Sequence, residues 1–209
     1  MKQRTSQILY RYWNEVRGTR LAPTRFEIEP GRITGILSET FILEGDRRSF
    51  KFRLAGTRMC EQLGRELRGK EFLELFGEED TAVLSRSIEA ITAQGAVGVF
   101  ELEARDASER AVTFELILLP LVHTGRTVSR YVGAMSAIDA PVWLGTVPLR
   151  PTGLLRHSLH WPDGRPHEVI ARGNQAPFLP GLAAARIVRN QRRQFRVLDG
   201  GRQPSLPEK

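Results

Sequence analysis

Three consecutive runs in the centre of the chain alternate apolar and polar residues, and this pattern constrains the fold more than any other. Residues 97–105, 111–119 and 128–138 each place an apolar side chain at nearly every second position. A period of two is typical of β-strands, whose successive side chains point to opposite faces of a sheet. The polar sequences "DASER" and "HTGRT" between the runs indicate turns. The sequence therefore predicts an antiparallel meander of three strands.

Two more strand-like segments precede the meander, at residues 41–43 and 50–54. Residues 80–94, between them and the meander, have the apolar spacing of a helix, and so do residues 6–17 near the start. An α+β fold with one five-stranded antiparallel sheet and flanking helices accounts for this order. Asp80 or Thr81 is expected to cap the longer helix, and Gly95 to end it.

Glycines follow the second predicted strand in the sequences "FRLAGT" and "GRELRG", among several arginines. A phosphate-binding loop would need closely spaced glycines, and a lysine followed by serine or threonine. Eight positions separate Gly56 from Gly64, and no such lysine pair follows a glycine. The glycines are therefore interpreted as the ends of short elements.

The charge of the chain is unevenly distributed. Residues 1–139 carry 20 basic and 20 acidic residues, so the net charge of +7 comes from residues 140–209, with 11 basic and 4 acidic residues. Nine of the 12 prolines also lie beyond residue 140. This shift in composition predicts an N-terminal helix and lead-in over 1–24, a domain over 25–140, and a Pro/Arg-rich C-terminal extension over 141–209.

Several features favour a cytoplasmic location. The single cysteine, Cys60, cannot form an internal disulfide. No stretch approaches the roughly 20 apolar residues of a membrane span. The basic start has no long apolar block or cleavage site of the kind that a signal peptide has.

The order of residues in the first two thirds of the chain resembles the PAS domain, in particular a bacterial subfamily in which the PAS domain stands nearly alone. The resemblance covers roughly residues 7 to 140, and "YVGAMSAID" is similar to the last PAS strand. It implies a five-stranded sheet and short helices that wall a small pocket. The matching residues are Tyr12, Trp13, Pro23, Arg25, Ile28, Pro30, Phe52 through Thr57, Gly64, Arg65, Leu67 and Gly69.

The resemblance raises the question of a bound cofactor, because PAS domains include haem, flavin and small-acid sensors. The helix predicted at 80–94 lacks the histidine that haem members supply, and Cys60 lacks the motif of flavin photosensors. We therefore expect no cofactor, and either a small-metabolite pocket or a core filled by its own side chains. The inward set would be Phe52, Leu54, Met59, Phe72, Phe100, Phe114 and Leu116.

An apolar stripe on the first helix predicts an interface. It could pack on the sheet, on a second copy in a homodimer, or on another signalling protein. The stripe consists of Ile8, Leu9, Tyr12, Trp13 and Val16.

An arginine-rich segment near the C-terminus could bind an anion, such as a nucleic acid backbone or an acidic protein. It could equally be a solvated basic face that pairs with the chain's own acidic residues. Its members are Arg186, Arg189, Arg192, Arg193 and Arg196.

No catalytic set emerges from the sequence. His157, His160 and His167 lie close together but lack the organised ligands of a zinc site, and we expect no metal. Ser158, His160 and Asp163 are too close in sequence to form a typical triad. The sequence thus predicts a non-enzymatic, cytoplasmic sensory or adaptor protein of signal transduction. The alternative is an anion- or nucleic-acid-associated regulator that uses the arginine-rich segment.

Overall fold

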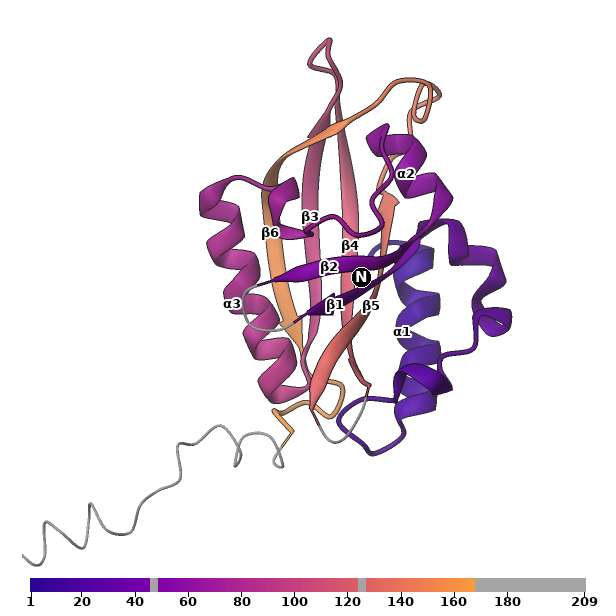
Figure 1. The fold of residues 1–209 in the computed structure, drawn as a ribbon, viewed down its shortest axis with the longest axis vertical. Helices are drawn as coiled ribbons and strands as arrows, with labels where there is room; N and C mark the ends of the chain where they lie inside the picture. The colour runs from indigo at the N-terminus through magenta and orange to yellow at the C-terminus, as the bar shows by residue number, and fades with distance from the viewer. Residues whose placement is uncertain (46–48, 124–126, 168–209) are drawn as a thin grey trace, which may run out of the picture. The chain divides into compact units, whose positions relative to one another are not determined.

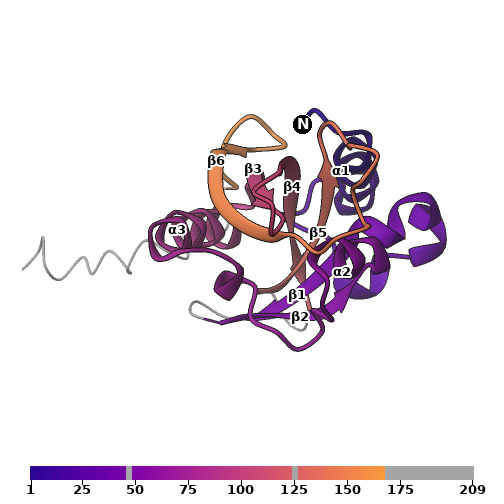
Figure 2. The same cartoon turned by 90° about the horizontal axis from the view of Figure 1, so that it is seen from above.

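The computed structural model describes residues 1–45, 49–123 and 127–167. These residues form one six-stranded sheet in the order β2-β1-β5-β4-β3-β6, and all neighbouring strands are antiparallel (Figures 1 and 2). The strands are β1 (Thr40–Gly45), β2 (Phe50–Ala55), β3 (Val97–Arg105), β4 (Ala111–Val122), β5 (Val128–Ala137) and β6 (Arg150–His160).

Three α-helices and three 3₁₀-helices flank this sheet in the described part of the chain. They are α1 (Arg4–Arg17), η1 (Arg25–Glu27), η2 (Pro30–Glu39), α2 (Thr57–Leu63), η3 (Leu73–Leu75) and α3 (Glu78–Gln94). None of the described helices is long and apolar enough to cross a membrane.

The helix predicted at 80–94 is α3, and it ends as expected at Gly95, whose φ is 66°. The predicted cap was wrong, because the helix begins at Glu78 and Gly77 precedes it. Asp80 and Thr81 therefore lie inside the first turn. Three acidic residues in that turn favour the earlier start, since the N-terminal end of a helix is electrically positive.

The prediction of five strands was also wrong, because β6 adds a sixth beside β3. β6 comes from the segment that the sequence analysis assigned to the C-terminal extension. Besides its pairing with β3, this segment contacts α2 and α3: the Leu149 N–H donates to the carbonyl of Gln62 at 2.7 Å, and the Leu154 N–H donates to Asp80 Oδ2 at 3.0 Å. Arg17 on α1 also donates two hydrogen bonds to Asp163.

The two faces of the sheet carry separate apolar clusters. The first, here called the inner cluster, lies between the sheet and α2, η3 and α3. The second, here called the outer cluster, lies between the sheet and α1 and η2. Figure 2 shows α1 and α3 on opposite sides of the sheet. In the outer cluster Trp13 is fully buried, and its ring N–H donates to the carbonyl of Pro120 at 2.8 Å.

Candidate functional site

Six of the seven residues predicted to line a pocket lie in the inner cluster, where each is at most 2% exposed. Two of their rings are in contact, because Phe72 is 5.8 Å from Phe52, and Phe72 is also 6.2 Å from Phe41, centroid to centroid. Neither of the two pockets described below is lined by any of the six. The six residues are Phe52, Met59, Phe72, Phe100, Phe114 and Leu116.

Leu54, the seventh, is not an inward residue, because its side chain is 44% exposed on the opposite face. The cause is a bulge in β2. Leu43 pairs with Phe52, but its neighbour Ile42 pairs with Leu54, so Arg53 is an extra residue in the strand. One extra residue reverses the alternation beyond it. Leu54 therefore lies on the side of Ile42 and the outer cluster.

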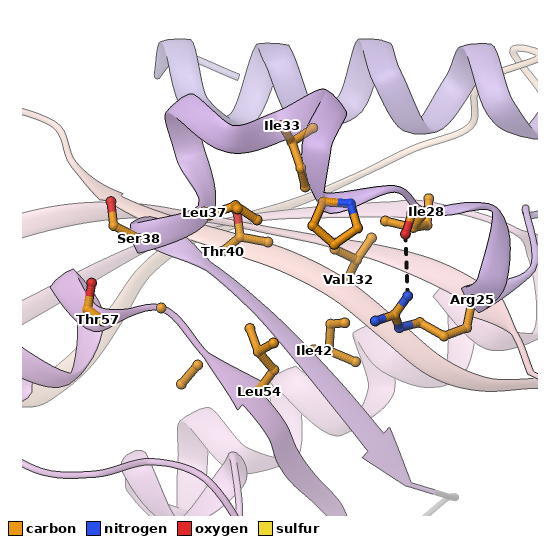
Figure 3. Close-up of a pocket in the computed structure, with 13 residues that line it drawn as sticks. Arg25, Ile28, Ile33, Leu37, Ser38, Thr40, Ile42, Leu54, Thr57 and Val132 are labelled. Carbon is orange, nitrogen blue, oxygen red and sulfur yellow. Dashed lines mark hydrogen bonds between the residues drawn. The ribbon is translucent and has the colours of Figure 1, made fainter.

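Leu54 borders an open apolar groove of about 330 Å³, here called the η2 groove (Figure 3). Ile33 and Leu37 face it from η2, and Ile42 and Leu54 face it from the strands. Arg25 stands at one end and Ser38 and Thr57 at the other. The lining residues are Arg25, Ile28, Pro30, Ile33, Leu37, Ser38, Thr40, Ile42, Leu54, Ala55, Gly56, Thr57 and Val132.

The wall of the η2 groove is fixed by two close contacts. The hydroxyl of Tyr12 donates to the carbonyl of Glu27 at 3.3 Å and accepts from the Glu29 N–H at 2.8 Å, which holds Ile28 between them. At the other end, a Cβ on Gly56 would lie 2.2 Å from the carbonyl oxygen of Ser38. Only glycine allows β2 and η2 to approach this closely.

Arg25 supplies the charge of the groove. It is half-buried, and its guanidinium donates to the Ile28 carbonyl at 3.4 Å. No carboxylate of the described residues forms an ion pair with it, whereas its neighbour Arg20 binds both oxygens of Glu27 at 2.9 Å. The groove therefore combines an apolar floor with one cation that has no described acidic partner.

Glu27 anchors the turn that carries Arg25. The pKa of Glu27 is lowered to about 2, because its charged form accepts hydrogen bonds from two donors. The Arg20 guanidinium has the larger effect and the Thr24 N–H the smaller. The Thr24 hydroxyl donates to the same carboxylate at 2.8 Å. Glu27 thus stays ionised at neutral pH and fixes the turn.

The apolar stripe of α1 is largely used within the chain. Leu9, Tyr12 and Trp13 are at most 6% exposed in the outer cluster, and Ile8 and Val16 are partly buried against it. The stripe packs on the sheet, which was one of the alternatives that the sequence left open.

The other sequence candidates are not brought together. His157 and His160 are exposed on β6, and His160 Nε2 lies 3.0 Å from Ser158 Oγ. Asp163 instead accepts two hydrogen bonds from Arg17, at 2.7 and 3.1 Å, so it does not orient His160. No group of three metal-ligating side chains occurs among the described residues. The five arginines between residues 186 and 196 lie outside them.

Sequence reasoning missed the η2 groove. The sequence analysis assigned no helix to the segment "PGRITGILSE", yet Ile33, Ile36 and Leu37 recur at helical spacing. That spacing was the available signal for a helical turn with one apolar side.

Comparisons with known proteins found a family model and several solved structures. A family model of the PAS domain matches residues 1–136. No curated protein matches the chain. The PAS-B domain of Drosophila melanogaster Cycle with bound glycerol is 18% identical, with a TM-score of 0.36, and the match covers 46% of this chain and 98% of that one.

Two further solved structures are similar at the same level. The PAS domain of an HTR-like protein from Haloarcula marismortui is 18% identical, with a TM-score of 0.37, over 55% of this chain and 95% of that one. An RNA-binding light-oxygen-voltage receptor is 17% identical, with a TM-score of 0.40, over 59% of this chain but only 37% of the receptor. Because the family model matches more than half of its residues, this chain belongs to the PAS domain family.

Proposed function

We propose that this protein is a non-catalytic, cytoplasmic adaptor of signal transduction, and that it binds an apolar helix of another signalling protein in the η2 groove. PAS domains are sensory and signalling modules, which gives the general role. The observation that carries the proposal is the exposed Leu54 beside an apolar groove that ends in Arg25. The lone cysteine supports a reducing compartment.

The packing of the inner cluster favours binding of a partner protein over binding of a small molecule inside the domain. The six residues predicted to line an interior pocket are buried against one another. The η2 groove, in contrast, is open and lined by apolar side chains. An exposed concave apolar surface favours the docking of another apolar surface, because docking removes both from water.

The state of the sheet edge favours a partner that docks as a helix over one that adds a β-strand. β2 is an edge strand, but residues 69–72 already occupy part of its free side. The Phe52 N–H donates to Lys70, while the carbonyls of Phe52 and Phe50 accept from Gly69 and Phe72. A partner strand would have to displace these bonds. A helix that inserts apolar side chains leaves them in place.

The charge of Arg25 defines the partner further. A guanidinium without a described carboxylate partner is expected to attract an acidic residue at the edge of the docked helix. The proposed partner segment therefore has apolar residues at i, i+3 or i+4 and i+7, with aspartate or glutamate at one end.

Selection of displayed helical peptides on the immobilised full chain tests this proposal. We expect peptides with that apolar spacing and an acidic residue. Leu54→Glu is expected to weaken their binding at least tenfold, about 1.4 kcal/mol. Leu155→Glu is the matched control, because Leu155 is 53% exposed on β6, and it should leave affinity unchanged.

A charge swap makes the test specific. Arg25→Glu should weaken binding of the selected peptide. A peptide with lysine in place of its acidic residue should bind that variant again. Failure to select such peptides, or equal affinity for Leu54→Glu and the wild-type chain, would contradict the proposal. A wild-type dimer that Leu54→Glu converts to a monomer would show instead that a second copy occupies the groove.

A further inference from the structure

A second pocket, of about 330 Å³, lies apart from the η2 groove and is lined mainly by polar groups. It lies where the start of α1, the end of η2, α2, the end of β5 and the segment 140–145 meet. We call it the Gln62 pocket. Its lining residues are Gln3, Thr5, Glu39, Arg58, Glu61, Gln62, Ser136, Ala137, Ala140, Pro141, Leu144 and Gly145.

Two buried side chains of this pocket each have a polar atom without a hydrogen-bond partner among the described residues. Gln62 and Ser136 are each only 5% exposed. Gln62 Oε1 and Ser136 Oγ have no partner among the described residues. A buried polar atom without a partner costs about 1–3 kcal/mol, so native proteins rarely retain two in one place without a role.

The position of Gln62 is nevertheless fixed. Its carbonyl accepts from the Leu149 N–H at 2.7 Å, and its residue lies within α2. Only the side-chain amide is left to bind something else. An amide offers both a donor and an acceptor, and the hydroxyl of Ser136 does so too. Together they match a molecule that carries hydroxyl or amino groups.

The charges around the pocket select against anions. Glu39 is neutralised by Arg58, whose Nη1 lies 2.6 Å from Glu39 Oε1, and the hydroxyl of Thr5 donates to its other oxygen. Glu61 is exposed and has no ion-pair partner among the described residues. One negative charge therefore remains. It favours a neutral or cationic ligand over a carboxylate or a phosphate.

We propose that the Gln62 pocket binds a small neutral or cationic molecule with several hydroxyl or amino groups, through Gln62 and Ser136. The walls of the pocket belong to anchored elements. At the start of α1, the carboxylate of Glu115 accepts from the backbone N–H groups of Lys2 and Gln3. Bound ligand would connect α1, α2 and β5, so its occupancy would stabilise all three. This site does not depend on a partner in the η2 groove.

Three sugars of similar size and different charge test the proposal by NMR titration of the full chain. The probes are D-glucosamine, D-glucose and D-glucuronate. We expect glucosamine and glucose to shift the side-chain amide signals of Gln62, with glucuronate binding at least severalfold more weakly. No shift with any probe, or tightest binding of glucuronate, would overturn the proposal.

Two variants separate a binding role from a structural one. Gln62→Leu and Ser136→Ala should each weaken glucosamine binding at least tenfold. Ser136→Ala should not lower the melting temperature, because it removes a hydroxyl without a partner. Ser87→Ala is the matched control: Ser87 is 4% exposed, and its hydroxyl donates to the Val83 carbonyl at 2.9 Å. The control should leave glucosamine binding unchanged. Unchanged binding in both pocket variants would contradict the assignment.

Discussion

The two faces of the sheet differ in how completely they are covered. Five aromatic ring pairs lie in the inner cluster among the described residues, contributed by strands and by the segment around η3. The outer cluster is mainly aliphatic, and its cover at one edge is η2, a 3₁₀-helix with a kink at Ile33. Large rings fill the space between elements on the inner face, whereas the irregular helix η2 over aliphatic side chains leaves a groove. The difference fits the proposal that the inner face mainly stabilises the fold, while the η2 groove on the outer face is open to a partner.

The largest expected effect is on the inner face. Phe72→Ala removes a ring that is 1% exposed and contacts Phe41, Phe52 and Phe76. It should lower the free energy of unfolding by about 3–5 kcal/mol, since the packed neighbours cannot close the cavity. Leu54→Ala on the outer face should change the free energy of unfolding by no more than about 0.5 kcal/mol. Urea denaturation of both variants measures this difference, and equal losses would contradict the assignment of the two faces.

Much of the sheet could be predicted because its signal is local. The strand predicted at residues 97–105 has those bounds in β3, and β4 and β5 were located to within a few residues. Alternation requires only that one face of a strand be buried, and each of these strands contains that information in its own sequence.

The features that were missed depend on partners distant in sequence. β6 has bulges opposite Glu101–Leu102 and Glu103–Ala104, and most of its side chains are exposed, so no clear alternation marks it. The bulge at Arg53 likewise arises from the pairing of β2 with β1, and it alone places Leu54 outside. Both pockets form where several such elements meet. Their residues carry no shared pattern along the chain.

A smaller effect is expected from the hydroxyl that holds the groove wall. Tyr12→Phe removes the bonds to the carbonyl of Glu27 and the N–H of Glu29, and leaves the buried ring in place. The free energy of unfolding should fall by about 1 kcal/mol. Binding of the groove peptide should weaken as well, because Ile28 is no longer fixed. Calorimetric titration measures this, and unchanged affinity would show that the wall is held by other contacts.

The smallest expected effect is the dependence of stability on pH at Glu27. Its pKa is about 2 in the folded chain, against a usual value of 4.5. The ionised side chain therefore stabilises the fold at pH values above 4.5. This contribution is lost as the pH falls from about 5 towards 2. Because the side chain is 38% exposed, we expect less than about 1 kcal/mol.

Glu27→Gln isolates this contribution. Urea midpoints of wild type and variant should differ most at neutral pH and converge in acid, since the protonated glutamate and the glutamine are both uncharged. Glu15→Gln is the control, because it removes only the exposed ion pair with Arg32. A difference between Glu27→Gln and wild type that stays constant with pH would mean that the shape of the side chain, and not its charge, holds the turn below the η2 groove.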